Sequence, residues 1–103
     1  MKSLKIPCVG YEIAADWYDG KLENDNVLLV LVGYTSCKAN YAELVTAIVQ
    51  KTGYSALVVD YTGHGESPFI LDDLTSAQNF MEVITSYDWL VENYPSKTIS
   101  VMG

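Results

Sequence analysis

Two short apolar runs separated by a helical stretch constrain the fold of this sequence most strongly. Residues 27–32 are apolar at every position, and residues 56–59 repeat that pattern. A strand that is apolar on both sides is covered on both faces, which is typical of parallel strands inside a sheet. The intervening residues 40–52 carry an amphipathic helical stripe, made of Tyr41, Leu44, Val45, Ile48 and Val49. The pattern predicts a strand–helix–strand unit with parallel strands.

The flanking residues extend this unit on both sides. Residues 3–19 are expected to form a hairpin that turns at Val9 and Gly10, with Ile6, Cys8, Tyr11 and Ile13 as strand residues. Asn40 is the expected N-cap of the first helix, and Gly53 its C-terminal stop.

A second helix is expected over about residues 74–94, followed by Pro95 and a third strand at residues 98–102. Its predicted buried stripe is Leu74, Ala77, Met81, Ile84, Tyr87 and Val91. The aromatic side chains are expected to pack in the core and at its rim rather than to form a ligand cage; they include Tyr11, Trp17, Tyr18, Tyr87, Trp89 and Tyr94.

Composition limits the classes of partner. The 103 residues suit one domain, and the formal net charge is −7. All six basic residues are lysine, so the chain lacks the guanidinium forks that bind phosphates, and nucleic acid is not an expected partner. Neither a signal peptide nor a membrane span is recognisable, which favours the cytoplasm. Cys8 and Cys37 are read as thiols in a reducing compartment rather than as a disulfide.

Glycine-containing segments follow the first two buried strands, and they carry the strongest family signal. Gly33 and Tyr34 follow the first strand, and the second runs through Asp60 into residues 63–67, Gly-His-Gly-Glu-Ser. These residues resemble the α/β-hydrolase family, in which a D-x-R-G-x-G-x-S loop follows the corresponding strand. Thr62 replaces the arginine of that loop, and Val32 stands where the family commonly has histidine.

The resemblance implies a fold and a mechanism. The fold is a partial α/β-hydrolase: an N-terminal hairpin and three parallel strands, with helices on both faces of the sheet. Gly33 matches the oxyanion-loop glycine, and the N–H of Tyr34 would be one oxyanion donor. Gly63, His64, Gly65 and Ser67 would form a structural loop that lines the pocket.

The nucleophile elbow, G-x-S-x-G in this family, is expected to begin at Gly103. The resemblance places the serine two residues later, and the acid and histidine of the triad in still later loops. Residues 1–103 would then hold no triad residue and be inactive alone.

Other chemistries fit less well. His64 and Ser67 are three residues apart in one turn, whereas a triad base meets its nucleophile from a separate segment. One histidine with scattered carboxylates lacks metal-ligand spacing, so neither a metal nor a cofactor is expected. Asp72 and Asp73 are expected to favour the start of the second helix.

Three functional hypotheses remain. The first is part of a serine hydrolase that acts on carboxylic esters or related acyl substrates. The second is a small non-catalytic α/β module that assembles through the exposed edge of its third strand, where Ile99, Val101 and Met102 are apolar. The third is a flavodoxin-like or nucleotide-binding fragment, against which the absence of a phosphate-binding loop counts.

Overall fold

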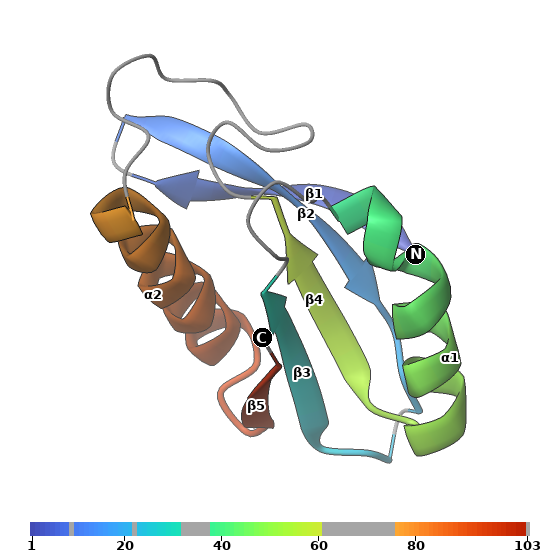
Figure 1. The fold of residues 1–103 in the computed structure, drawn as a ribbon. Helices are drawn as coiled ribbons and strands as arrows, with labels where there is room; N and C mark the ends of the chain where they lie inside the picture. The colour runs from blue at the N-terminus through green and yellow to red at the C-terminus, as the bar shows by residue number, and fades with distance from the viewer. Residues whose placement is uncertain (9, 22, 32–37, 61–75, 103) are drawn as a thin grey trace.

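The structure is a computed structural model that describes residues 1–8, 10–21, 23–31, 38–60 and 76–102, with backbone only for residues 76–80. Within these residues the chain forms five strands, one short 3₁₀ helix and two α-helices (Figure 1). In chain order they are β1 (Lys2–Cys8), β2 (Tyr11–Tyr18), β3 (Asn26–Leu31), η1 (Lys38–Tyr41), α1 (Ala42–Thr52), β4 (Ser55–Val59), α2 (Ser76–Asn93) and β5 (Thr98–Met102).

All five strands join one sheet in the order β1-β2-β4-β3-β5. Strands β1 and β2 form the predicted hairpin, and β2 pairs antiparallel with β4. Strand β3 pairs in parallel with both β4 and β5. The chain therefore crosses from β3 to β4 on one side of β3 and returns to β5 on the other side.

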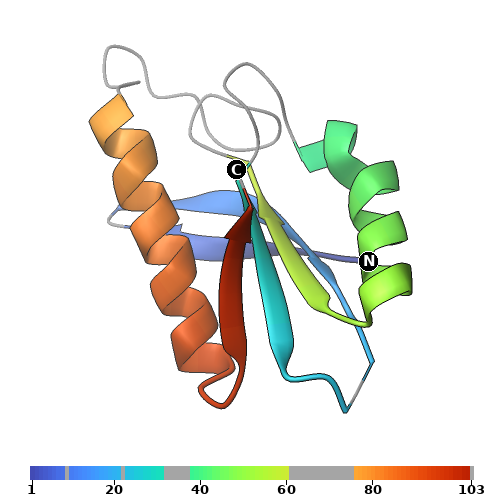
Figure 2. The same ribbon diagram turned by 60° about the horizontal axis from the view of Figure 1, so that its bottom comes forward.

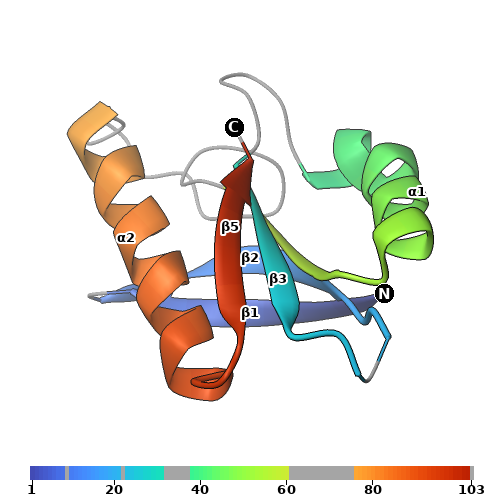
Figure 3. The same cartoon turned by 90° about the horizontal axis from the view of Figure 1, so that it is seen from below.

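The two α-helices lie on opposite faces of the sheet (Figures 2 and 3). Two crossovers of the same hand that run in opposite directions produce this arrangement. The predicted fold class, an N-terminal hairpin plus three parallel strands with helices on both faces of the sheet, is confirmed. No helix in the described part of the chain is both long and apolar enough to cross a membrane.

The core lies between the sheet and the helices, and β4 is its centre. Every residue of β4 is buried, as expected for an apolar strand with a neighbour on each side. Helix α1 contributes Val45, which is fully buried, and α2 contributes Leu90. The apolar runs at residues 27–32 and 56–59 therefore identified the inner strands correctly, although Val32 lies outside the described residues.

The two ends of α1 differ from each other in how well the sequence predicted them. Gly53 ends the helix in a left-handed conformation, with φ of 76°, and its N–H donates to the carbonyl of Val49, as expected. Asn40 is not the N-cap, because it lies inside the preceding η1 and Tyr41 holds the cap position without a side-chain bond. Leu44, expected on the buried stripe, is half exposed.

The predicted buried stripe of α2 is wrong over the described side chains. Met81, Ile84, Tyr87 and Val91 are all exposed, whereas Glu82, Ser86 and Leu90 are buried at a spacing of four residues. A carboxylate can occupy the buried face because the Tyr11 hydroxyl of β2 donates to Glu82 Oε2 at 2.5 Å. The Ser86 hydroxyl is satisfied within the helix by the carbonyl of Glu82 at 2.8 Å. Leu74 and Ala77 are not among the side chains described.

Candidate active site

The carboxyl ends of the three parallel strands lie side by side at one end of the sheet. Leu31 of β3 lies opposite Val59 of β4, and Val30 lies opposite Met102 of β5. In open α/β sheets, ligands bind at this edge where the strand order reverses. The predicted site residues follow these strand ends in sequence, but they lie outside the described residues: Gly33, Tyr34, Gly63, His64, Gly65, Ser67 and Gly103. Their roles therefore stay predictions.

Asp60 lies at this end of the sheet and is held there by two hydrogen bonds. It follows β4 directly, is completely buried, and donates its backbone N–H to the carbonyl of Ala14 at 2.9 Å. Its Oδ1 accepts the backbone N–H of Lys38 at 2.6 Å. Lys38 is the first described residue after segment 32–37, and Asp60 is the last before segment 61–75. One charge-assisted hydrogen bond thus joins the bases of the two segments that carry the predicted site residues.

A buried ion pair stands beside this bond. The Nζ of Lys38 lies 3.2 Å from Oδ1 of Asp16, and both side chains are 5% exposed. The Ser3 hydroxyl donates to the same oxygen at 3.1 Å. Such a pair loses much hydration on folding, so its geometry and additional hydrogen bonds determine whether it stabilises the fold. Lys38 therefore contacts Asp60 through its backbone and Asp16 through its side chain.

The ion pair affects a neighbouring phenol. Burial, and secondarily the Asp16 carboxylate, raise the pKa of Tyr18 above its ordinary value, while the Lys38 ammonium acts in the opposite direction. Tyr18 therefore stays protonated at neutral pH and is not a base.

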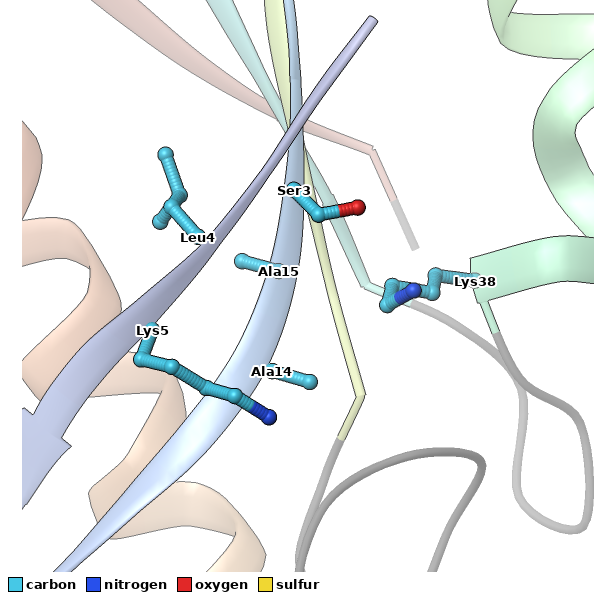
Figure 4. A pocket seen from close by; sticks show the side chains of 6 residues that line it. All are labelled: Ser3, Leu4, Lys5, Ala14, Ala15 and Lys38. Atoms are coloured by element: carbon cyan, nitrogen blue, oxygen red, sulfur yellow. The ribbon is translucent and has the colours of Figure 1, made fainter.

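The ammonium of Lys38 also faces a small hollow between β1, β2 and η1 (Figure 4). Its volume is about 110 Å³, and its walls are Ser3, Leu4, Lys5, Ala14, Ala15 and Lys38.

The described residues bring together no nucleophile and base. The single histidine of the chain, His64, lies outside them. Burial, and then the charge of Glu82, raise the pKa of the Cys8 thiol, against a lowering by the Tyr11 hydrogen bond. Since the thiolate is the nucleophilic form, Cys8 is a poor candidate for covalent chemistry. The described side chains also show no group of three potential ligands placed to hold a metal ion.

Asp16 and Lys38 were not singled out from the sequence. Asp16 interrupts the apolar stretch of β2, between Ala15 and Trp17. A carboxylate in a buried strand requires a partner, so this interruption was a usable signal that a cation must come from elsewhere. Asp60 was recognised only as a match to the family loop, without its bond to Lys38.

Solved structures that resemble this fold include two esterases and a thioesterase domain. The Est1E structure from Butyrivibrio proteoclasticus, solved with ferulic acid bound, matches 97% of this chain with a TM-score of 0.82 and 19% identity. An esterase of Pyrococcus furiosus, Pf2001, matches 97% with a TM-score of 0.79 and 27% identity. The chain carries a partial α/β-hydrolase fold. The thioesterase domain of the curacin biosynthetic pathway matches 98% of it at 18% identity, with a TM-score of 0.73.

The chain spans well under half the length of these proteins. It covers 41% of Est1E, 38% of the Pyrococcus esterase and 34% of the thioesterase domain. No protein-family model matches the sequence, and the search of curated proteins finds no match. The family resemblance is thus confirmed at the level of the fold.

Proposed function

We propose that this chain supplies part of the active site of a serine hydrolase that acts on carboxylic esters or related acyl substrates. The observation that carries the proposal is the meeting of three parallel strand ends in the order β4-β3-β5, within a fold shared with esterases. This edge is where the family resemblance places the oxyanion loop, the pocket loop and the nucleophile.

The proposed chemistry is acyl transfer. The backbone N–H of Tyr34 would donate to the oxygen that becomes negative when a serine attacks the carbonyl carbon. That serine would lie two residues beyond Gly103, and the acid and histidine would come from later loops. Gly33, Gly63, His64, Gly65 and Ser67 would shape the pocket. The bond between Asp60 and Lys38 supports the proposal, because it ties the two loop-bearing segments together at their bases.

Under this proposal the 103-residue chain alone is inactive, because it holds the oxyanion donor but no triad. The test is hydrolysis of 4-nitrophenyl acetate and butyrate, with the Pyrococcus esterase as positive control. We expect no release of nitrophenolate above the buffer rate, and no change on His64→Ala or Ser67→Ala. Catalytic turnover that either substitution abolishes would contradict the assignment of both residues to a structural loop.

A second candidate function, an assembly module, is favoured by one observation. Strand β5 is the edge of the described sheet, and Val101 on it is 53% exposed. Unprotected apolar edges pair with other strands, so two copies would associate along β5. Sedimentation of the wild-type chain and Val101→Lys tests this function, with Leu44→Lys on the opposite side of the sheet as the matched control. Association lost only in Val101→Lys supports it, and a monomeric wild-type chain contradicts it.

A further inference from the structure

Helix α2 presents a row of apolar side chains to solvent. Met81, Ile84, Tyr87 and Val91 are each between 39% and 58% exposed. They follow one another at spacings of three, three and four residues, so they are neighbours along one side of the helix. A second helix packs against side chains with this spacing. The described structure therefore leaves a helix-packing surface of α2 partly uncovered.

This row lies on the side of α2 that faces away from β1. The opposite side carries Trp89, which lines a cleft together with Lys2 and Leu4 of β1. At 3.6 residues per turn, the buried Leu90 lies between Trp89 and Tyr87 around the helix. Strands β1 and β5 are the two edges of the sheet, and β5 lies beside α2 in Figures 2 and 3. The row is therefore on the β5 side of the helix.

Strand β5 adds one exposed apolar side chain on the same face of the sheet. Val101 lies opposite Leu29, Leu29 opposite Leu57, and Leu57 opposite Trp17, so these four side chains share a face. Trp17 stacks on Tyr94, the residue that follows α2, which identifies this face as the α2 face. Val101 is half exposed there. Two neighbouring elements thus contribute uncovered apolar groups to one side of the molecule.

The charge that borders the row is negative. Asp88 and Glu92 are both exposed, and they lie one turn apart along the side of the row that faces away from the sheet. The sequence of α2 contains no basic residue. Lys97, which follows the helix, is occupied elsewhere: its Nζ donates to the carbonyl of Asn24 at 2.8 Å and lies 4.0 Å from Oδ1 of Asp25. A partner that is apolar in the middle and positive along one edge complements this surface.

We propose that this surface docks a basic amphipathic helix supplied from outside residues 1–103. The apolar side of that helix would contact Ile84, Val91 and Val101, and its lysine or arginine residues would face Asp88 and Glu92. More than half of each matched esterase lies outside the fold shared with this chain, so such proteins hold sequence from which a helix could come. A second copy fits less well, because two α2 helices would bring their acidic residues together. The proposal is independent of the proposed function, since docking requires no acyl transfer.

The test is a titration with a fluorescent amphipathic peptide, LKKLLKLLKKLLKL, followed by fluorescence anisotropy at about pH 7. The matched peptide, LEELLELLEELLEL, keeps the apolar side and reverses the charge. We expect saturable binding of the lysine peptide with a dissociation constant on the order of 10⁻⁵ M. The glutamate peptide should bind at least about ten-fold more weakly. Equal binding of the two peptides, or no saturable binding of the lysine peptide, would overturn the proposal.

Two variants and two controls locate the surface, all at exposed positions. Ile84→Ser should weaken binding of the lysine peptide about five-fold, because it removes apolar contact area. Leu44→Ser, on α1 across the sheet, is the matched control and should leave binding unchanged. Asp88→Lys should weaken the lysine peptide about five-fold and strengthen the glutamate peptide. Glu43→Lys changes the net charge equally on α1 and should have a much smaller effect.

Equal weakening by Asp88→Lys and Glu43→Lys would mean that the peptide responds only to the net charge of −7, and would refute the docking surface. Self-association of the wild-type chain that Ile84→Ser abolishes would assign the row to a second copy. Partition into phosphatidylcholine vesicles that the same substitution abolishes would assign it to a membrane. Either of these two results would overturn the proposed occupant.

Discussion

The two faces of the sheet are held to their helices by different chemistry. On the α1 face, the ammonium of Lys38 is buried 3.2 Å from the carboxylate of Asp16. On the α2 face, the rings of Trp17 and Tyr94 stack with centroids 4.7 Å apart and planes 3° from parallel. Both contacts start from neighbouring residues of β2, which point to opposite faces.

The two contacts contribute differently to the fold. The ion pair mainly constrains the geometry of the residues it joins, whereas the aromatic stack mainly lowers the free energy of the folded state. Burying the two ions costs hydration, so the pair contributes little net free energy even though loss of one partner is severe. Stacked aromatic rings remove apolar area from water and stabilise the fold directly. The ionic face is also the one whose lysine is bonded to Asp60 at the base of both predicted loop segments. The charged face therefore joins Lys38 to Asp60, and the aromatic face packs the residue that follows α2 against the sheet.

The largest expected effect is on the ionic face. Lys38→Met leaves the Asp16 carboxylate buried without its cation, and should lower the free energy of unfolding by about 4 kcal/mol. Urea unfolding followed by circular dichroism measures the change. The control is the double variant Asp16→Leu with Lys38→Met, which removes both charges and should lose less than half as much. A double variant as unstable as the single one would contradict the view that the pair constrains geometry more than it stabilises.

On the aromatic face, the position of the buried stripe of α2 can be tested directly. Leu90→Ala should cost about 3 kcal/mol, because it opens a cavity at a completely buried side chain. Val91→Ala, the neighbouring residue on the exposed side, should cost less than about 1 kcal/mol. Thermal unfolding of the two variants compares them. The reverse order would restore the stripe through Ile84 and Val91 that the sequence predicted.

The sequence predicted correctly the strands and the helix end that depend only on residues near them in the chain. Apolar composition marks β3 and β4, and Gly53 alone supplies the left-handed residue that ends α1. The buried face of α2 depends instead on a contact between Glu82 and Tyr11, which are 71 residues apart, so the helical period alone selects the wrong side. The pairing of Lys38 with Asp16 was likewise not predictable from local pattern, because it requires the fold to exist first.

Stacking on Trp17 should have a smaller effect than cavity formation. Tyr94→Leu keeps apolar bulk beside the indole but loses the ring contact, and should cost about 1 kcal/mol. Tyr87→Leu is the control on an exposed position of the same region, expected to change stability by less than about 0.5 kcal/mol. Chemical denaturation of both variants provides the comparison, and equal losses would argue against a specific stack.

The smallest effect concerns the reactivity of Cys8 near α2. Since burial and the Glu82 charge raise the pKa of this thiol, less thiolate is present at about pH 8 than in a free cysteine, and alkylation is slower. Glu82→Gln removes the charge, lowers the pKa, and should speed alkylation of Cys8 by about two- to five-fold at that pH. Peptide mass mapping after iodoacetamide treatment separates Cys8 from Cys37. An unchanged rate profile between about pH 7 and pH 10 would show that Glu82 does not influence the thiol.

The central proposal is that this chain carries part of an acyl-transfer site but not its nucleophile. A fluorophosphonate probe, which forms a covalent bond with activated serines, tests that claim when the labelled residue is located by mass spectrometry. We expect no phosphonylated serine in the 103-residue chain, while the Pyrococcus esterase is labelled in parallel. Stoichiometric labelling of Ser67 that disappears in His64→Ala would contradict this proposal. Residues 63–67 would then hold the nucleophile and its base rather than form a structural loop.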